Sequence, residues 1–151
     1  MNDVKKGIFE IDGIEVSKDT KVEDVITEKM DVYIDDTEGD KYAEICSYSN
    51  MLSFIGGEFS AEYCFFNDKL KEIEFVPFLG NNPGYPDLKY QKAKYDYCSN
   101  LLIKAFGKPD MEDERGISYS FDGGGIGCHQ ILDGRRKGQG GILRIRFVDR
   151  G

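Results

Sequence analysis

Hydrophobic and polar residues alternate near the start of the chain with the period of a β-strand. Residues 8–16 carry apolar side chains at alternate positions on both sides of Asp12-Gly13, a pair that readily adopts the positive φ angles of a tight turn. This pattern predicts a hairpin. Thr20 and Glu23 follow at capping-box spacing, and apolar residues recur at helical intervals as far as Met30. We therefore expect a helix of about three turns after the hairpin.

Segments rich in aromatic and β-branched residues fill the middle of the chain, and turn residues separate them. The gaps are too short for crossover helices, so the strands should pair antiparallel as a meander. The expected strands are Val32–Asp35, Tyr42–Tyr48, Met51–Ile55, Phe59–Phe66 and Leu70–Val76.

A long helix is the clearest element of the second half. Residues 77–86 hold three of the four prolines and should form a loop, after which Asp87 can cap a helix that runs to about Phe106. Gly107 is suited to the left-handed residue that ends such a helix. The stripe expected to face the sheet is Tyr90, Lys94, Tyr97, Leu101 and Ala105, widened by Cys98 and Leu102.

Three strands should close the chain, at Ile117–Phe121, Ile126–Leu132 and Ile142–Val148, each with one buried and one wet face. Strand-rich sequence with two helices predicts an α+β fold: a mainly antiparallel sheet with one short and one long helix packed on one face. No linker or repeat interrupts the pattern, so we expect a single domain over residues 1–151.

Composition narrows the setting in which the protein works. Hydrophobic residues make up 40% of the 151 residues and charged residues 32%, which is typical of a globular chain and excludes a disordered one. No apolar run reaches the roughly 18 residues of a membrane span, and residues 1–17 do not resemble a signal peptide. The four cysteines form no CxxC pair. We expect reduced thiols, no metal or cofactor, and a cytoplasmic location.

The net charge of −8 is concentrated in one region. Residues 1–40 hold 13 acidic and 5 basic side chains, whereas residues 41–151 hold 15 of each. Such a region would repel nucleic acid and steer a basic protein partner, although solvated surface charge alone also explains it. The excess is densest at Asp35, Asp36, Glu38 and Asp40.

Two motifs with possible chemistry fail on inspection. Counted from Asp35, the acidic run places glycine fifth and Cys46 twelfth, which does not fit a calcium-binding EF-hand loop. The glycines of residues 123–127 precede a strand rather than a helix, so they lack the amides that bind phosphate and are interpreted as a hairpin turn.

His129 is the only histidine, and its neighbour Cys128 should point to the opposite face of a strand. A catalytic pair between these two residues is therefore not expected. In the loop of residues 77–86, by contrast, Phe78 and Tyr85 could anchor a partner, or Phe78 could tuck under the sheet.

The acidic first quarter, the helix exit at residues 101–109 and the three-strand ending resemble the small acidic immunity proteins encoded beside bacterial polymorphic and contact-dependent toxins. The resemblance implies a non-catalytic protein that neutralises one toxin domain with a basic face, often a nuclease. From the charge run and the loop of residues 77–86, we expect the binding residues to be Asp35, Asp36, Glu38, Asp40, Phe78 and Tyr85. The alternative is a small enzyme or ligand-binding domain whose site combines His129 with cysteine and tyrosine side chains.

Overall fold

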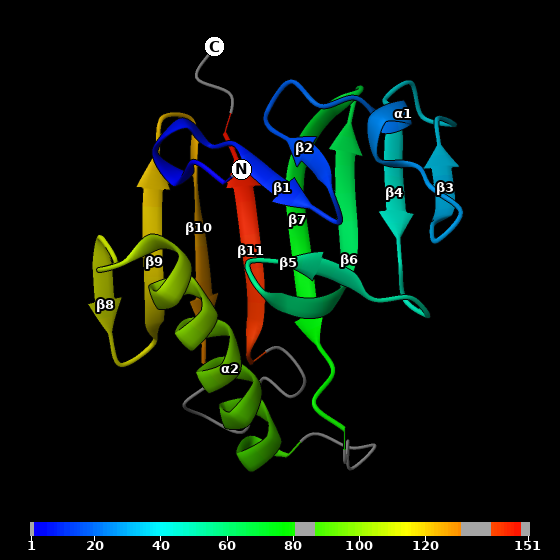
Figure 1. Ribbon diagram of the computed structural model, residues 1–151. Coiled ribbons are helices and arrows are strands. Elements are labelled where there is room, and N and C mark those ends of the chain that lie inside the picture. The colour runs from blue at the N-terminus through cyan, green and yellow to red at the C-terminus, as the bar shows by residue number, and fades with distance from the viewer. Residues whose placement is uncertain (1, 81–86, 131–139, 149–151) are drawn as a thin grey trace.

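A computed structural model describes residues 2–80, 87–130 and 140–148 (Figure 1). Its helices are the 3₁₀ turn η1 (Val4–Lys6), α1 (Val22–Val25) and α2 (Leu88–Phe106). Its strands are β1 (Phe9–Ile11), β2 (Ile14–Val16), β3 (Asp31–Asp35), β4 (Tyr42–Cys46), β5 (Leu52–Phe54), β6 (Gly57–Phe66), β7 (Lys69–Pro77), β8 (Met111–Asp113), β9 (Gly116–Phe121), β10 (Gly124–His129) and β11 (Ile142–Phe147).

One large sheet organises the molecule. Its strands follow the order β3-β4-β6-β7-β11-β10-β9-β8, with β5 paired to β6 outside this path, and every pairing is antiparallel. The β1–β2 hairpin, β5 and both α-helices lie on one side of it (Figure 1). The predicted α+β fold, with its helices on one face of a mainly antiparallel sheet, is confirmed.

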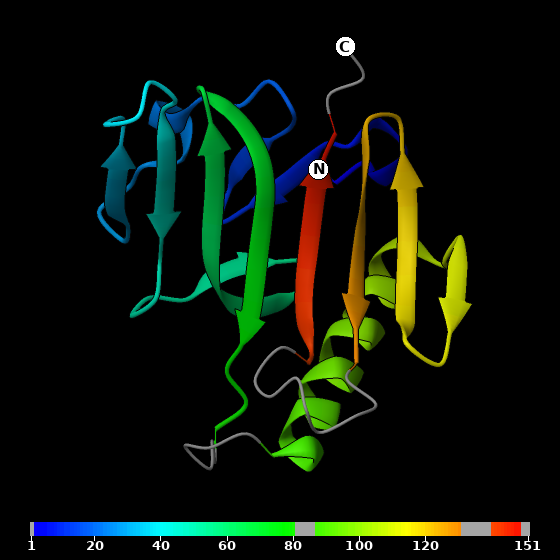
Figure 2. The same cartoon turned by 180° about the vertical axis from the view of Figure 1, so that it is seen from behind.

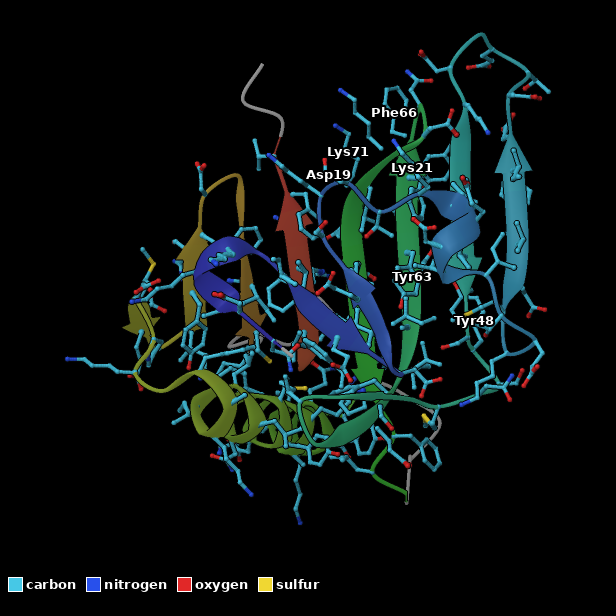
Figure 3. All side chains as sticks on the ribbon, turned by 45° about the horizontal axis from the view of Figure 1, so that its top comes forward. Asp19, Lys21, Tyr48, Tyr63, Phe66 and Lys71 are labelled. Carbon is cyan, nitrogen blue, oxygen red and sulfur yellow. The ribbon has the colours of Figure 1, made fainter. Side chains whose placement is uncertain are left out.

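The core lies between the sheet and this cover. Alternate residues of the strands point into it, and Phe54 of β5 stacks on Phe75 of β7 with ring centroids 4.5 Å apart. Phe9 of the hairpin meets Phe54 edge to face, at 6.1 Å. Tyr63 of β6 is 1% exposed and lies between the hairpin and α1 (Figure 3). The hairpin turns at Asp12 and Gly13, both at positive φ, as the sequence predicts.

The long helix α2 begins and ends where the sequence predicts. The Asp87 carboxylate accepts hydrogen bonds from the Lys89 and Tyr90 amides, and the Gly107 amide bonds Ile103 O at the other end. The buried face contains Lys94, Cys98 and Leu102 of the predicted stripe, together with two polar residues that were not predicted. Its buried members are Gln91, Lys94, Cys98, Ser99 and Leu102. Leu101 is partly buried and packs against the core, as the sequence predicts, whereas Ala105 is exposed, so only the expectation for Ala105 was wrong.

The first helix is much shorter than predicted. It covers only Val22–Val25, and the Asp24 carboxylate caps the Lys21 amide at 2.8 Å in place of the expected Thr20–Glu23 pair. Thr20 instead accepts a hydrogen bond from the Ser17 amide. Isoleucine and threonine are poor helix formers, which explains why the chain leaves the helix at Ile26 and Thr27.

The final strands differ from the prediction at their edges. β10 begins at Gly124, so the glycines of residues 124–127 lie inside a strand, and only Gly123 belongs to the turn that the sequence predicted. The edge strand β8 was not predicted. The expected end of the second strand, Leu132, lies outside the described residues. The three-strand unit joins the rest of the sheet through β11 and β7, which pair from Leu143 with Phe75 to Arg146 with Glu72.

Candidate protein-binding surface

The second face of the sheet is not covered by any helix or strand in the described part of the chain (Figure 2). Cross-strand register divides this open face into two halves at the β7–β11 junction. At this boundary Arg144 Nε donates to Glu74 Oε1 at 3.0 Å and Arg146 Nε donates to Glu72 Oε1 at 3.1 Å. In the described part of the chain, these two arginines form ion pairs with Glu72 and Glu74 of β7 and with no carboxylate of β4 or β6.

We call the other half, on β3, β4 and β6, the acidic half. The side chains that it places on the open face are Asp31, Tyr33, Asp35, Tyr42, Glu44, Cys46, Glu62, Cys64 and Phe66. None of them is basic, and four are carboxylates. Tyr33 is 59% exposed and Phe66 is 42% exposed, so aromatic surface accompanies the negative charge.

Glu62 is a carboxylate of the acidic half that has paired neighbours on both adjacent strands. It pairs across strands with Cys46 on one side and with Glu74 on the other, and like charges at paired positions repel. Partial burial raises the pKa of the Glu62 carboxyl, and the charges of Glu44 and Glu74 raise it further. This position therefore favours an incoming positive charge.

Glu44, Cys46 and Glu62 also form the group best placed to hold a metal ion among the described residues. Their ligand atoms lie within 4.8 Å of one another. Two carboxylates and a thiolate would suit Zn²⁺, which takes both oxygen and sulfur ligands. The same carboxylates would equally accept the ammonium or guanidinium group of a protein partner.

Tyrosine hydroxyls border this carboxylate group. Tyr42 Oη donates to Glu44 Oε1 at 2.7 Å, and this hydrogen bond raises the pKa of Tyr42. Tyr48, which follows β4, is 67% exposed, and its pKa is raised first by its hydrogen bond with Cys46 (Figure 3). Tyrosines with an anchored hydroxyl and an exposed ring are typical of protein interfaces.

The cysteines of this half are not poised nucleophiles. Burial, followed by the charge of Glu62, raises the pKa of the Cys64 thiol to about 12. Burial also raises the pKa of Cys46. A thiol must lose its proton to attack a carbon or another sulfur, so the structure assigns neither residue a nucleophilic role.

Strand β3 forms the outer edge of the acidic half. Among the described residues it pairs only with β4. Val32, Tyr33 and Ile34 are 44%, 59% and 49% exposed, so both faces of this strand carry apolar surface. An exposed apolar edge strand is a template for pairing with another chain, and proteins usually block or cover such edges.

The predicted acidic residues begin at Asp35, the last residue of β3, and continue into the turn after it. Asp35 Oδ1 accepts hydrogen bonds from the amide and hydroxyl of Thr37, which lower the pKa of Asp35. Asp40 accepts a hydrogen bond from Asn67 Nδ2 at 3.1 Å. Asp36 and Glu38 are exposed. The structure thus joins these four carboxylates, the acidic turn, to the β3 edge.

Phe78 lies far from the acidic turn. It follows Pro77, the last residue of β7, whereas Asp35 aligns through β4 and β6 with Lys69 at the first. Eight residue steps along a strand correspond to roughly 26 Å. Phe78 is 61% exposed, so it does not tuck under the sheet. Tyr85 lies outside the described residues.

His129 lies on the open face of β10, in the half that contains Arg144 and Arg146. Its strand neighbour Cys128 points into the core, as expected from the sequence. The Tyr119 hydroxyl also lies on the helix side, where it bonds Gly107 O at 2.7 Å. Cys46 and Cys64 lie on the acidic half, beyond β7 and β11.

Sequence reasoning missed the Glu44–Cys46–Glu62 group. Alternation placed Glu62 and Cys64 on one face of their strand, but only the β4–β6 register brings Glu44 and Cys46 beside them. No helix in the described ranges has the length and apolar character needed to cross a membrane. Comparison with protein-family models, with curated proteins and with solved structures finds no match.

Proposed function

We propose that this protein is a non-catalytic, immunity-type inhibitor that binds one toxin domain through the β3 edge and the acidic turn. The observation that carries the proposal is that β3, an exposed apolar edge strand paired only with β4 among the described residues, ends in a cluster of carboxylates. The immunity role rests on the resemblance of the sequence, and the geometry supports its central requirement, which is a protein-binding surface.

The edge strand provides the contact area and the backbone hydrogen bonds. A partner strand added to β3 would pair with its outward amide and carbonyl groups, while Val32 and Ile34 would pack on one side and Tyr33 on the other. Tyrosine is frequent among the residues that dominate binding energy. Burial of this apolar surface would determine how long the complex lasts.

The charge pattern indicates which kind of partner fits. Asp31 and Asp35 flank the exposed apolar residues, and Asp36, Glu38 and Asp40 extend the negative charge. A second copy of this chain would bring the same carboxylates together and would be repelled. A partner with a basic edge would instead be attracted before contact, which accelerates association.

Glu44 and Glu62 provide a further subsite beside the edge. Tyr33 pairs with Glu44 across β3 and β4, so a partner that covers β3 reaches this carboxylate group directly. An arginine or lysine of the partner would relieve the repulsion that raises the pKa of Glu62.

The test uses the product of the neighbouring gene, expressed alone and together with this protein. We expect that product to be toxic alone, harmless together with this protein, and co-purified with it in a 1:1 complex. A neighbouring product that is not toxic, or that does not bind, would contradict the proposal.

Two matched variants then locate the interface. Ile34→Lys blocks the β3 edge with a charge, and Ile103→Lys makes the same change on α2, where Ile103 is 42% exposed. We expect Ile34→Lys to weaken binding at least tenfold and to abolish protection, while Ile103→Lys retains both. Equal effects of the two variants would exclude β3 as the interface.

A further inference from the structure

The other half of the open face contains a shallow hollow with a volume of about 340 Å³. Its floor is strand β10, at Gly125 and Gly127. β9 contributes Ser118 and Ser120 to one wall, and β11 contributes Arg144 and Arg146 to the other. The register is regular, because Gly125 lies between Ser120 and Arg146 while Gly127 lies between Ser118 and Arg144. β9, β10 and β11 lie side by side on this face (Figure 2).

The hollow exists because the floor has no side chains. A Cβ atom added to Gly127 would lie 2.7 Å from Ile117 O, so the backbone excludes any larger residue there. A Cβ atom at Gly125 would lie 3.1 Å from its nearest neighbour, Tyr119 O, so a small shift of the backbone could accommodate alanine there. Glycine inside a strand weakens it and often marks the close approach of a ligand or another backbone. The floor therefore offers flat peptide surface to a ligand.

The walls offer hydrogen-bond donors in a fixed arrangement. The Nε atoms of Arg144 and Arg146 are bound by Glu74 and Glu72, which hold the two guanidinium groups in place. A guanidinium has five N–H donors, so this contact through Nε uses only one of them. Ser118 and Ser120 add hydroxyl groups on the opposite wall.

Two guanidinium groups lie beside His129 in the lining of the hollow. Partial burial lowers the pKa of His129, and the charges of Arg144 and Arg146 lower it further. Asp113 of β8 opposes them with a smaller effect. An anion bound between the arginines would reverse this shift.

We propose that this hollow binds a small organic anion, with a flat ring on the glycine floor and a carboxylate or phosphate group on Arg144 and Arg146. The volume is within the range of small-molecule sites. A flat ring can stack on peptide planes where a branched one would meet the walls. Arginine is the side chain best suited to carboxylate and phosphate oxygens. This site is separate from the acidic half, so the proposal does not depend on the proposed function.

The test uses His129, the only histidine of the chain, as an NMR probe. Its imidazole signals are followed in the wild-type protein during titration with benzoate and with adenosine 5′-monophosphate. Benzamide and adenosine serve as uncharged analogues, and inorganic phosphate serves as the anion without a ring. We expect saturable shifts with millimolar or tighter affinity for the two charged ring compounds, together with a raised His129 pKa. The stronger of the two identifies carboxylate or phosphate as the preferred group.

Variants then assign the binding groups. Arg144→Gln and Arg146→Gln should each weaken binding at least tenfold, and Gly125→Ala should weaken it by obstructing the floor. Lys104→Gln, which removes one charge from α2, should have no effect. The absence of any saturable shift at 10 mM ligand would overturn the proposal, as would equal binding of benzamide and benzoate. Phosphate binding as tightly as adenosine 5′-monophosphate would overturn the role of the glycine floor.

Discussion

Arg144 and Glu74 face each other at paired positions on β11 and β7, with Arg144 Nε 3.0 Å from Glu74 Oε1. The pair lies at the junction between the three-strand unit at the end of the chain and the strands before it. It also separates two kinds of surface, because Arg144 and Arg146 form ion pairs with the carboxylates of β7 and, among the described residues, with none of β4 or β6. The open face therefore presents an acidic half and a half whose arginines are paired with carboxylates.

The Arg144–Glu74 pair should contribute measurably to stability. Both side chains are partly buried, at 25% and 29% exposure, so solvent screens them less than a fully exposed pair. A double-mutant cycle with Arg144→Gln and Glu74→Gln should give a coupling of about 1 kcal/mol in the free energy of unfolding. A coupling near zero, measured by urea denaturation, would show that the pair does not stabilise the fold.

Replacement of Glu62 should stabilise the folded protein at neutral pH. Its folded pKa is raised above the ordinary value of 4.5, so the proton that it binds favours the folded state only at low pH. This contribution is lost as the pH rises from about 4.5 through the raised pKa, where the carboxylate ionises among other carboxylates. Glu62→Gln should therefore raise the free energy of unfolding at pH 7 and raise it less at pH 4.

Glu58→Gln is the matched control for Glu62→Gln, because Glu58 is an exposed residue of the same strand that lies outside the stretch paired with β4. It should change the free energy of unfolding little at either pH. A Glu62→Gln variant that is less stable than the wild type at pH 7 would contradict this account of the acidic half. The effect on binding should be opposite to the effect on stability. Glu62→Gln should bind the partner more weakly than the wild type does.

The Cys64 thiol should react slowly in the folded protein. Its pKa of about 12 leaves roughly a thousandfold less thiolate at pH 8 than an unfolded cysteine has. Alkylation by iodoacetamide, followed for this cysteine by peptide mass spectrometry, should be slower by about that factor than in urea. The rate should rise about tenfold per pH unit between pH 8 and 10. A plateau near pH 9 would show an ordinary thiol.

The orientation of α2 can be tested by substitutions on opposite faces of the helix. Leu102 is fully buried against the sheet, so Leu102→Ala should reduce the free energy of unfolding by about 2–5 kcal/mol. Ile103→Ala, at a residue that is 42% exposed, should have an effect below about 1 kcal/mol. Urea denaturation measures both changes, and similar losses would mean that the helix packs through a different face.

Local signals in the sequence were sufficient for most elements of the fold. Asp12-Gly13 fixes the hairpin turn, and Asp87 and Gly107 fix the ends of α2, because turns and caps depend on a few neighbouring residues. The length of α1 was overestimated because periodicity from Thr20 to Met30 does not reveal that β-branched residues end the helix after one turn.

The pairing of strands that are distant in the sequence could not be predicted from local signals. Nothing local indicates that β11 returns to β7, so the ion pairs of Arg144 and Arg146 could not be expected from the sequence. The Glu44–Cys46–Glu62 group depends on the register between β4 and β6 for the same reason. The acidic turn was visible as a run of charges, whereas the apolar edge beside it emerged only once β3 was placed at the end of the sheet.

The most direct test of the proposed function is the association rate of the protein with its neighbouring gene product at several salt concentrations. Asp35, Asp36, Glu38 and Asp40 are replaced together by asparagine or glutamine. If the acidic turn steers a basic partner, this variant should associate about tenfold more slowly at low salt, with a flatter dependence on salt and a nearly unchanged dissociation rate. An association rate identical to that of the wild type at every salt concentration would contradict the account.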